Sequence, residues 1–266
     1  MLRLSLCKKL YVLSVLWITL GLSFFPSDDA LRHVAKAISG KDWHEILVVR
    51  EAFSMDSHPG WHFILEIFAR ISGYDNEVLL IISVCLLFLL FACTPVFLLK
   101  RPEAWIMSLL IFAIFSWGAV LRLFYGRPYI FSMFLVLMFC FLWQRIRDKE
   151  RPYSELIAFT LIAALSTWIH GTWYLLVLPL AALALAREWR VLGLMGSATI
   201  IGVFLGALLT GKPFVFLHQM VYHAVKAMST ADLQRQLVSE FWSFAGEPHA
   251  VIIVAAFLLW RRVRGQ

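Results

Sequence analysis

Apolar residues along this chain gather in long runs that are separated by short polar connections. The runs approach the roughly 20 residues that a helix needs to cross the hydrocarbon core of a bilayer. A hydrophobic fraction of 61% also excludes an ordinary soluble domain. We therefore expect an all-α, polytopic membrane protein that forms one integral membrane domain over residues 1–266. About eight transmembrane helices are expected, at residues 10–25, 78–99, 104–124, 129–143, 156–169, 173–186, 191–209 and 251–260.

Basic residues fall in alternate connections between these runs, and they predict the orientation of the chain. Because Lys and Arg are enriched in cytoplasmic loops, all the basic clusters are expected inside, with both termini cytoplasmic. The runs 156–169 and 173–186 could form one long helix, but basic flanks favour a hairpin at His170-Gly171. The clusters are Arg3, Lys8 and Lys9; Lys100 and Arg101; Arg145, Arg147, Lys149 and Arg151; Arg187 and Arg190; and Arg261, Arg262 and Arg264.

The net charge of +7 is explained by this topology, so no nucleic-acid partner is expected. The expected location is a multi-pass protein of a cell envelope, such as a bacterial inner membrane. Cys7 precedes the first run, and Cys85, Cys93 and Cys140 lie within runs. No cysteine is expected on the outer face, which excludes disulfides and a catalytic thiol there.

Two long segments, 26–77 and 210–249, are left on the extracytoplasmic side, and their patterns predict amphipathic helices in the membrane interface. In the first segment, Ser27 can cap a helix that ends at Gly40, and a second helix starts near Asp42. A third follows Pro59-Gly60, with Glu66 and Arg70 spaced as an i,i+4 pair. The expected apolar faces are Leu31, Val34, Ala35 and Ile38; Trp43, Ile46 and Leu47; and Trp61, Ile64, Leu65 and Phe68. The spacing of Val215, Gln219, Tyr222 and Lys226 suggests a further interfacial helix.

Two acids, Asp28 and Asp29, follow the first run almost immediately. Capping explains one acid at a helix N-terminus, because the macrodipole favours negative charge there. A second carboxylate at the membrane border can serve as a general base or bind a metal. Both interpretations stay open.

Histidines flank a Pro-Gly turn in the sequence Asp56-Ser57-His58-Pro59-Gly60-Trp61-His62. The turn itself accounts for the proline and glycine. His58 and His62 are four residues apart, but the intervening turn disfavours a regular helical zinc pair, and no third ligand has a diagnostic spacing. A divalent metal is therefore an open question.

Cationic residues add to the same face, where we expect every histidine of the chain to lie. Arg122 and Arg127 are on the outer side, where they either snorkel from a helix end or clamp a phosphate. His170 lies in the tight outer turn, and Lys212 opens the second outer segment.

The chain resembles the GT-C superfamily of membrane glycosyltransferases in three features. These are the acid pair after the first span, the interfacial helices and the stretch His58-Pro59-Gly60-Trp61-His62-Phe63. The arrangement looks like the branch of protein mannosyltransferases and aminoarabinose transferases, in which a Pro-containing element follows the acidic motif. In this chain Gly60 replaces the second proline. The resemblance covers the first half of the chain and, more loosely, residues 170–179. Family members usually have more spans and often a soluble C-terminal domain. The chain is therefore expected to be a minimal module, a truncated chain or a subunit that needs a protein partner.

The resemblance implies transfer of a sugar from a polyprenyl-phosphate donor to an acceptor on the extracytoplasmic face, with inversion. Asp28 or Asp29 would be the general base, and His58 would position the acceptor or the leaving phosphate. Substrate binding would fall to Arg122, Arg127, His62, His170 and Lys212. The alternatives are a carrier or flippase for lipid-linked saccharides, a partner subunit without catalysis, and an acyltransferase with a histidine base. Membrane lipids are partners in every case.

Overall fold

The computed structural model describes residues 11, 14–15, 28–46, 55–115 and 125–229. Within these ranges every helix or strand element is a helix, which confirms the all-α prediction. The helices are α2 (Asp28–Ser39), α3 (Trp43–Ile46), α4 (Pro59–Ile71), α5 (Asn76–Leu98), α6 (Pro102–Phe115), α8 (Tyr129–Asp148), α9 (Tyr153–Ile169), η1 (Trp173–Leu176), α10 (Val177–Leu185), α11 (Trp189–Leu208) and α12 (Pro213–Ser229).

Three of these helices, α5, α8 and α11, are long and apolar enough to cross a membrane. They match the runs predicted at 78–99, 129–143 and 191–209. The apolar helices α6, α9 and η1–α10 are shorter. Most of the run 10–25, all of 251–260 and the end of 104–124 lie outside the described residues. The count of eight spans therefore stays a prediction.

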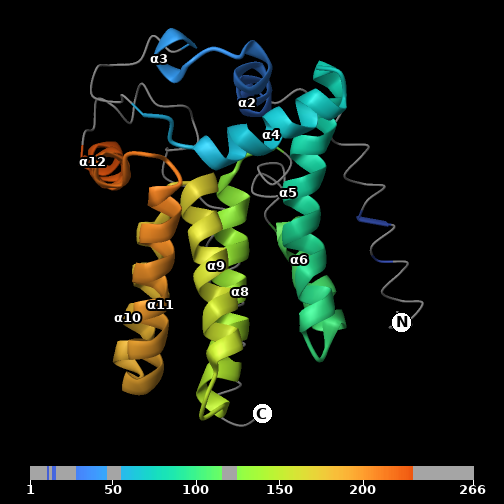
Figure 1. Cartoon of the computed structure of the whole chain (residues 1–266). Coiled ribbons are helices and arrows are strands. Elements are labelled where there is room, and N and C mark those ends of the chain that lie inside the picture. Colours follow the sequence, from blue (N-terminus) through green and yellow to red (C-terminus); the bar gives the residue numbers. More distant parts are fainter. Residues whose placement is uncertain (1–10, 12–13, 16–27, 47–54, 116–124, 230–266) are drawn as a thin grey trace.

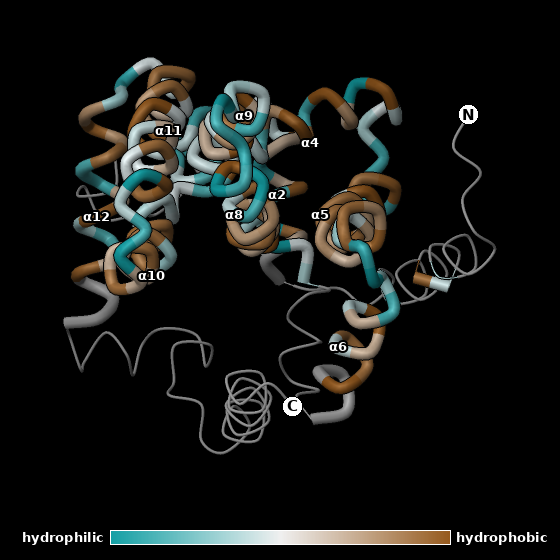
Figure 2. The backbone as a smooth tube through the Cα atoms, turned by 90° about the horizontal axis from the view of Figure 1, so that it is seen from below, coloured by the Kyte–Doolittle hydropathy of each residue, from teal (hydrophilic) through white to brown (hydrophobic). Residues whose placement is uncertain are grey.

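The apolar helices lie side by side, and their two ends differ in chemistry (Figure 1). Helices α2, α3, α4 and α12 lie across one end, which we call the histidine end because His33, His58, His62 and His170 meet there. At the opposite end lie the turns that connect α5 to α6, α8 to α9 and α10 to α11. We call it the basic end, because these turns carry the described basic clusters of residues 100–101, 145–151 and 187–190, respectively. Figure 2 views the molecule from that end and shows hydrophilic turns on mostly hydrophobic helices.

The predicted hairpin at His170-Gly171 is confirmed. Helix α9 ends at Ile169, and η1 starts at Trp173 after the turn. The chain then returns through α10 and runs back alongside α9 in α11 (Figure 1). The possibility of one continuous helix over 156–186 is thereby excluded.

Helix α11 packs directly on α9 through two glycines one turn apart. A Cβ added at Gly202 would lie 2.6 Å from the Thr160 carbonyl oxygen, and one at Gly206 would lie 2.2 Å from the Ala164 carbonyl oxygen. Small residues with this spacing let helices in membranes approach closely. The glycines therefore set the distance between α9 and α11.

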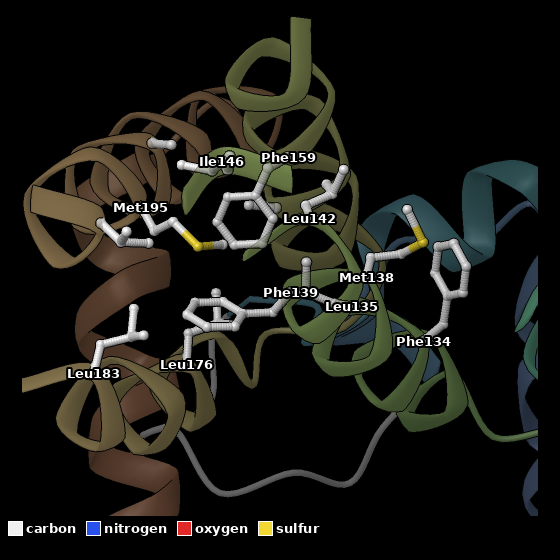
Figure 3. Packing of buried hydrophobic residues seen from close by; sticks show 13 residues of the cluster. Phe134, Leu135, Met138, Phe139, Leu142, Ile146, Phe159, Leu176, Leu183 and Met195 are labelled. Atoms are coloured by element: carbon white, nitrogen blue, oxygen red, sulfur yellow. The ribbon is translucent and has the colours of Figure 1, made fainter. Parts of the chain in front are cut away.

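The largest core cluster fills the space between α8, α9, η1–α10 and α11 (Figure 3). Phe139 and Phe159 meet edge to face with 5.4 Å between ring centroids, and Met195 lies beside them, fully buried. Large apolar side chains also point outward, such as Ile157 on α9 and Ile200 on α11, which are 61% and 72% exposed. An apolar exterior around a packed core is typical of helices that contact lipid.

The helices at the histidine end confirm the predicted boundaries but correct two of the predicted faces. Gly40 ends α2 with φ +62°, and Glu66 pairs with Arg70 on α4 at 2.6 Å, both as expected. On α2, however, Leu31 and Ala35 are exposed, and the buried face is Ala30, His33, Val34 and Ala37. On α12, Val215 is exposed, and the buried face is Phe216, Gln219 and Met220.

The face of α2 is rotated because α4 and α5 both pack against it. Their contacts select the side that fits between the two helices, not the most apolar side. His33, which the sequence assigned to the polar side of this helix, is consequently buried with 8% of its surface exposed.

Candidate functional site

Four histidine side chains from three parts of the chain meet at the histidine end. His33 comes from α2, His58 and His62 from the start of α4, and His170 from the turn after α9. The His58 ring stacks on the His170 ring with centroids 5.0 Å apart, and it meets the His33 ring edge-on at 5.1 Å. His33 and His62 lie 5.0 Å apart. We call these residues the histidine cluster.

The Pro-Gly turn places two of these rings. Pro59 takes the first position of α4, where a missing N–H costs nothing, and His58 is the residue that precedes it. A Cβ on Gly60 would lie 2.6 Å from the Trp168 ring, so only glycine allows α4 to approach the end of α9 this closely. This approach brings His58 onto His170.

A chain of hydrogen bonds runs from Asp56 through His62 to His33. Asp56 Oδ2 lies 2.5 Å from His62 Nδ1, and His62 Nε2 lies 2.8 Å from His33 Nδ1. An ionised carboxylate only accepts, so His62 Nδ1 carries a proton, and in a neutral His62 ring Nε2 is left as an acceptor. His33 must then donate from Nδ1, which leaves its Nε2 with a free lone pair. The tautomers thus make His33 Nε2 a proton acceptor.

The other carboxylate oxygen of Asp56 holds the turn itself. Asp56 Oδ1 accepts from the backbone N–H of His58 at 2.8 Å. Both oxygens of Asp56 are therefore engaged within the cluster, which fixes the carboxylate relative to His62.

His170 has hydroxyl partners instead of a carboxylate. Its Nδ1 lies 3.0 Å from Ser132 Oγ and 2.7 Å from Thr172 Oγ1, and the two hydroxyls are 2.7 Å apart. Ser132 belongs to the first turn of α8 and is buried. The cluster is thereby connected to α8 as well as to α2, α4 and α9.

Arg127 lies beside the cluster in the segment that leads into α8. Gly126 packs tightly there: with φ +62°, a Cβ would meet Ala30 of α2 at 2.9 Å and Ser83 of α5 at 3.0 Å. Arg127 also lies near the Tyr125 ring, 5.6 Å from its centroid. Its positive charge is close enough to lower the pKa of His33.

Helix α12 holds the Asp56 segment through a two-point contact. Gln219 Nε2 donates to the Met55 carbonyl at 2.7 Å, and the Met55 N–H donates to Gln219 Oε1 at 3.0 Å. Gln219 is buried, and Met55 packs near Phe216 and Met220. Helix α12 therefore fixes the residue next to Asp56.

Burial favours the neutral imidazole at three positions of the cluster, His33, His58 and His170. Desolvation, followed by the charges of neighbouring histidines, lowers the pKa of His33 and of His58 well below the usual 6.5. Desolvation alone lowers the pKa of His170 to about 3. These three rings are therefore neutral near pH 7.

Acid is expected to loosen the histidine end. In the unfolded chain these histidines bind protons below about pH 6.5, whereas in the folded chain they do so only at lower pH. The unfolded state then holds more protons, so stability falls as the pH drops below about 6.5. Hydrogen exchange of α2 and α4, corrected for intrinsic rates, should be faster at about pH 5 than at about pH 7.5.

The variant His170→Asn provides the matched control, because its amide can keep the contact with Ser132 but does not titrate. It should reduce the difference between the two pH values. Equal protection at both pH values in the unsubstituted protein would contradict the account.

Among the described residues, no group of three or more His, Cys, Asp or Glu side chains is arranged to hold a metal ion. The described cysteines Cys85 and Cys93 of α5 and Cys140 of α8 are free thiols.

The structure brings His58, His62 and His170 together and places Arg127 beside them, as the sequence proposed. The side chains of Asp28 and Asp29 and the whole of Arg122 lie outside the described residues, although the two acids form the first turn of α2. Lys212 is exposed in the turn before α12, where its N–H contacts Thr210. Sequence reasoning did not select His33, nor three residues that bond to the cluster, namely Asp56, Ser132 and Thr172.

Comparisons of the chain with protein-family models, with curated proteins and with solved structures each found no match.

Proposed function

We propose that this protein is a multi-pass membrane glycosyltransferase that moves a sugar from a polyprenyl-phosphate donor to a hydroxyl acceptor at the histidine end. The observation that supports it best is the hydrogen-bonded chain Asp56–His62–His33. With a neutral His62, this chain ends in an unprotonated ring nitrogen of His33. A donor carried by a lipid requires a site at the membrane boundary, and the cluster lies at the end of an apolar bundle.

Proton transfer is the first part of the proposed reaction. His33 Nε2 takes the proton of the acceptor hydroxyl, and the Asp56 carboxylate stabilises the resulting charge through His62. The acceptor oxygen attacks the anomeric carbon as the bond from that carbon to the phosphate oxygen breaks. The phosphate leaves with the electron pair, and the configuration inverts. Asp28 and Asp29, which precede His33 on α2, are the second candidate for this base through the resemblance to GT-C enzymes.

The depressed pKa of His33 suits a base that must be neutral before the donor binds. A donor phosphate beside the cluster would raise this pKa, because negative charge favours the protonated ring. Arg127 is the described cation nearest to this position and would stabilise the leaving phosphate with its planar guanidinium. His58 and His170 would orient the substrates. Arg122 and Lys212 stay as proposed contributors to phosphate binding.

The basic clusters favour an extracytoplasmic site. In the described part of the chain they lie at the end opposite to the histidine cluster (Figure 1). Lys and Arg mark cytoplasmic connections, so the cluster would face the opposite side of the membrane. An envelope location such as a bacterial inner membrane fits a polyprenyl-linked substrate.

A carrier for lipid-linked saccharides is the second candidate, and the charge distribution argues against it. A transport path requires ionisable groups deep within spans. In the three candidate spans the charged side chains lie in terminal turns, namely Glu77 in α5, Arg145, Arg147 and Asp148 in α8, and Arg190 in α11. This distribution favours a site on one side.

The test is transfer by the purified protein in liposomes. We expect radiolabelled polyprenyl-phosphate sugars to give labelled products with a mixture of hydroxyl acceptors, without nucleotide sugar. Movement of the donor between leaflets without product would support the carrier and contradict the transferase.

A further inference from the structure

We propose that the basic end holds a binding site for an anionic glycerophospholipid, in a groove between α5, α6 and α8. The groove has a volume of about 270 Å³ and is lined mainly by apolar side chains, including Pro95, Leu98, Trp105, Leu137 and Phe141. This site lies apart from the histidine cluster and does not depend on the proposed function.

The groove has the dimensions of an acyl chain. Its wall on α8 runs from Phe134 to Gln144. At a rise of about 1.5 Å per residue, this stretch of helix is roughly 15 Å long, comparable to much of one lipid leaflet. The wall on α5 runs from Thr94 to Leu99 and ends at the turn to α6.

Positive charges stand at the end of the groove that meets the membrane boundary. Lys100 directly follows the lining residue Leu99, with Arg101 next to it, and Arg145 directly follows the lining residue Gln144. The Arg145 guanidinium lies 4.3 Å from the centre of the Phe141 ring, which itself lines the groove. All three cations are exposed.

These cations are available to a ligand, unlike others at the same end. Arg147 pairs with Asp148, Lys149 pairs with the buried Glu155, and Arg190 donates to the backbone carbonyls of residues 147, 149 and 150. Lys100, Arg101 and Arg145 have no ion pair within the described ranges. The one nearby acid in the first turn of α6, Glu103, leaves an excess of positive charge.

A second groove of similar volume, between α9 and α11, shows that an apolar hollow alone does not define the site. Its lining includes Ile157, Leu194 and Ser197. At the end of that helix pair Arg190 is occupied by backbone carbonyls, and the exposed Arg151 and Arg187 do not adjoin a lining residue. In the groove between α5, α6 and α8, exposed cations directly follow lining residues, so an apolar wall and available charge meet there. This is the chemistry that a phosphate headgroup and its acyl chain require.

Native mass spectrometry of the purified full chain tests the proposal, with dioleoyl phosphatidylglycerol and dioleoyl phosphatidylcholine as probes that differ only in the headgroup. We expect phosphatidylglycerol to bind more tightly. Each basic residue near an anionic lipid contributes about 1 kcal/mol, or roughly fivefold in affinity. The double variant Arg101→Gln/Arg145→Gln should therefore weaken phosphatidylglycerol binding roughly 25-fold.

Two matched controls make the test specific to this groove. Arg151→Gln/Arg187→Gln removes two exposed arginines from the same end and should leave phosphatidylglycerol affinity unchanged. Cys140→Trp fills the proposed groove and should weaken binding, whereas Ser197→Trp fills the other groove and should not.

Equal affinity for the two lipids, or equal loss in both arginine variants, would overturn the proposal in favour of unspecific adsorption. Unchanged binding by Cys140→Trp would do the same, because the acyl chain would then lie elsewhere. Cys140 should also react with a maleimide in detergent and be protected by phosphatidylglycerol. A thiol that is protected without lipid would show that the chain itself covers the groove, which contradicts the assignment.

Discussion

Replacing Gly206 with alanine is expected to destabilise the helix bundle by about 3 kcal/mol, at the upper end of the cost of overpacking a well-packed core. The added Cβ would lie 2.2 Å from the Ala164 carbonyl oxygen and 2.8 Å from Thr167 Cβ. A backbone oxygen inside a helix cannot move aside as a flexible side chain can, so α9 and α11 must separate. The free energy of unfolding in lipid or mild detergent should show this loss.

Gly196→Ala on the same helix is the matched control. Nothing lies within 4 Å of the Cβ that it adds, and alanine is the better helix former. This variant should be as stable as the unsubstituted protein or slightly more stable. Equal effects at the two positions would show that the glycines of α11 do not set its distance from α9.

Asp56→Asn is expected to reduce transfer by about two to four decades while donor binding is retained. The backbone N–H of His58 donates to Asp56 Oδ1, so the oxygen of the introduced amide must take that position. The NH₂ of the amide must then take the position of Oδ2, which faces His62. His62 would then accept at Nδ1 and carry its proton on Nε2, which forces His33 to accept at Nδ1. His33 Nε2 would hold the proton and could no longer act as a base. An aspartate that fixes the tautomer of a catalytic histidine has effects of about this size.

Asp42→Asn is the control for this substitution, because Asp42 is exposed outside the cluster. Transfer by Asp56→Asn at the rate of the unsubstituted protein would exclude the chain Asp56–His62–His33 as the proton acceptor. If instead only Asn variants of Asp28 or Asp29 lost transfer, the base would be the acid that the resemblance assigns.

Much of the fold could be predicted because hydropathy and local turn chemistry are properties of short segments. The runs that became α5, α8 and α11 are long enough to be read from composition alone. The end of α2 at Gly40 and the start of α4 at Pro59 follow from the backbone preferences of glycine and proline. The turn at His170 was indicated by basic residues on both flanks.

The orientation of the helices at the histidine end could not be predicted in the same way. The apolar stripe of α2 pointed to Leu31, yet the helix buries His33, because the contacts with α4 and α5 decide which side is covered. A periodic pattern shows which side of a helix is most apolar. It contains no information about a polar contact that a distant segment provides.

The candidate site was only partly visible for the same reason. His58, His62 and His170 stood out as polar residues beside apolar runs, whereas Ser132 lies inside an apolar run and looked like part of a span. Asp56 was within the motif, but its bond to His62 depends on the turn that α12 holds through Gln219. The signal that could have selected Asp56 is an acid that precedes two histidines and a Pro-Gly turn.

The most direct test of the central claim is the position of the donor on the protein. A polyprenyl-phosphate sugar with a photoreactive group beside the phosphate should label the purified chain, and unlabelled donor should compete. Mass spectrometry of the labelled peptides should find the probe on residues 56–62, 127–132 or 170–172, which surround the histidine cluster. The account would be contradicted if the labelling that unlabelled donor suppresses were found only at the basic end, at residues 100–101 and 145–151.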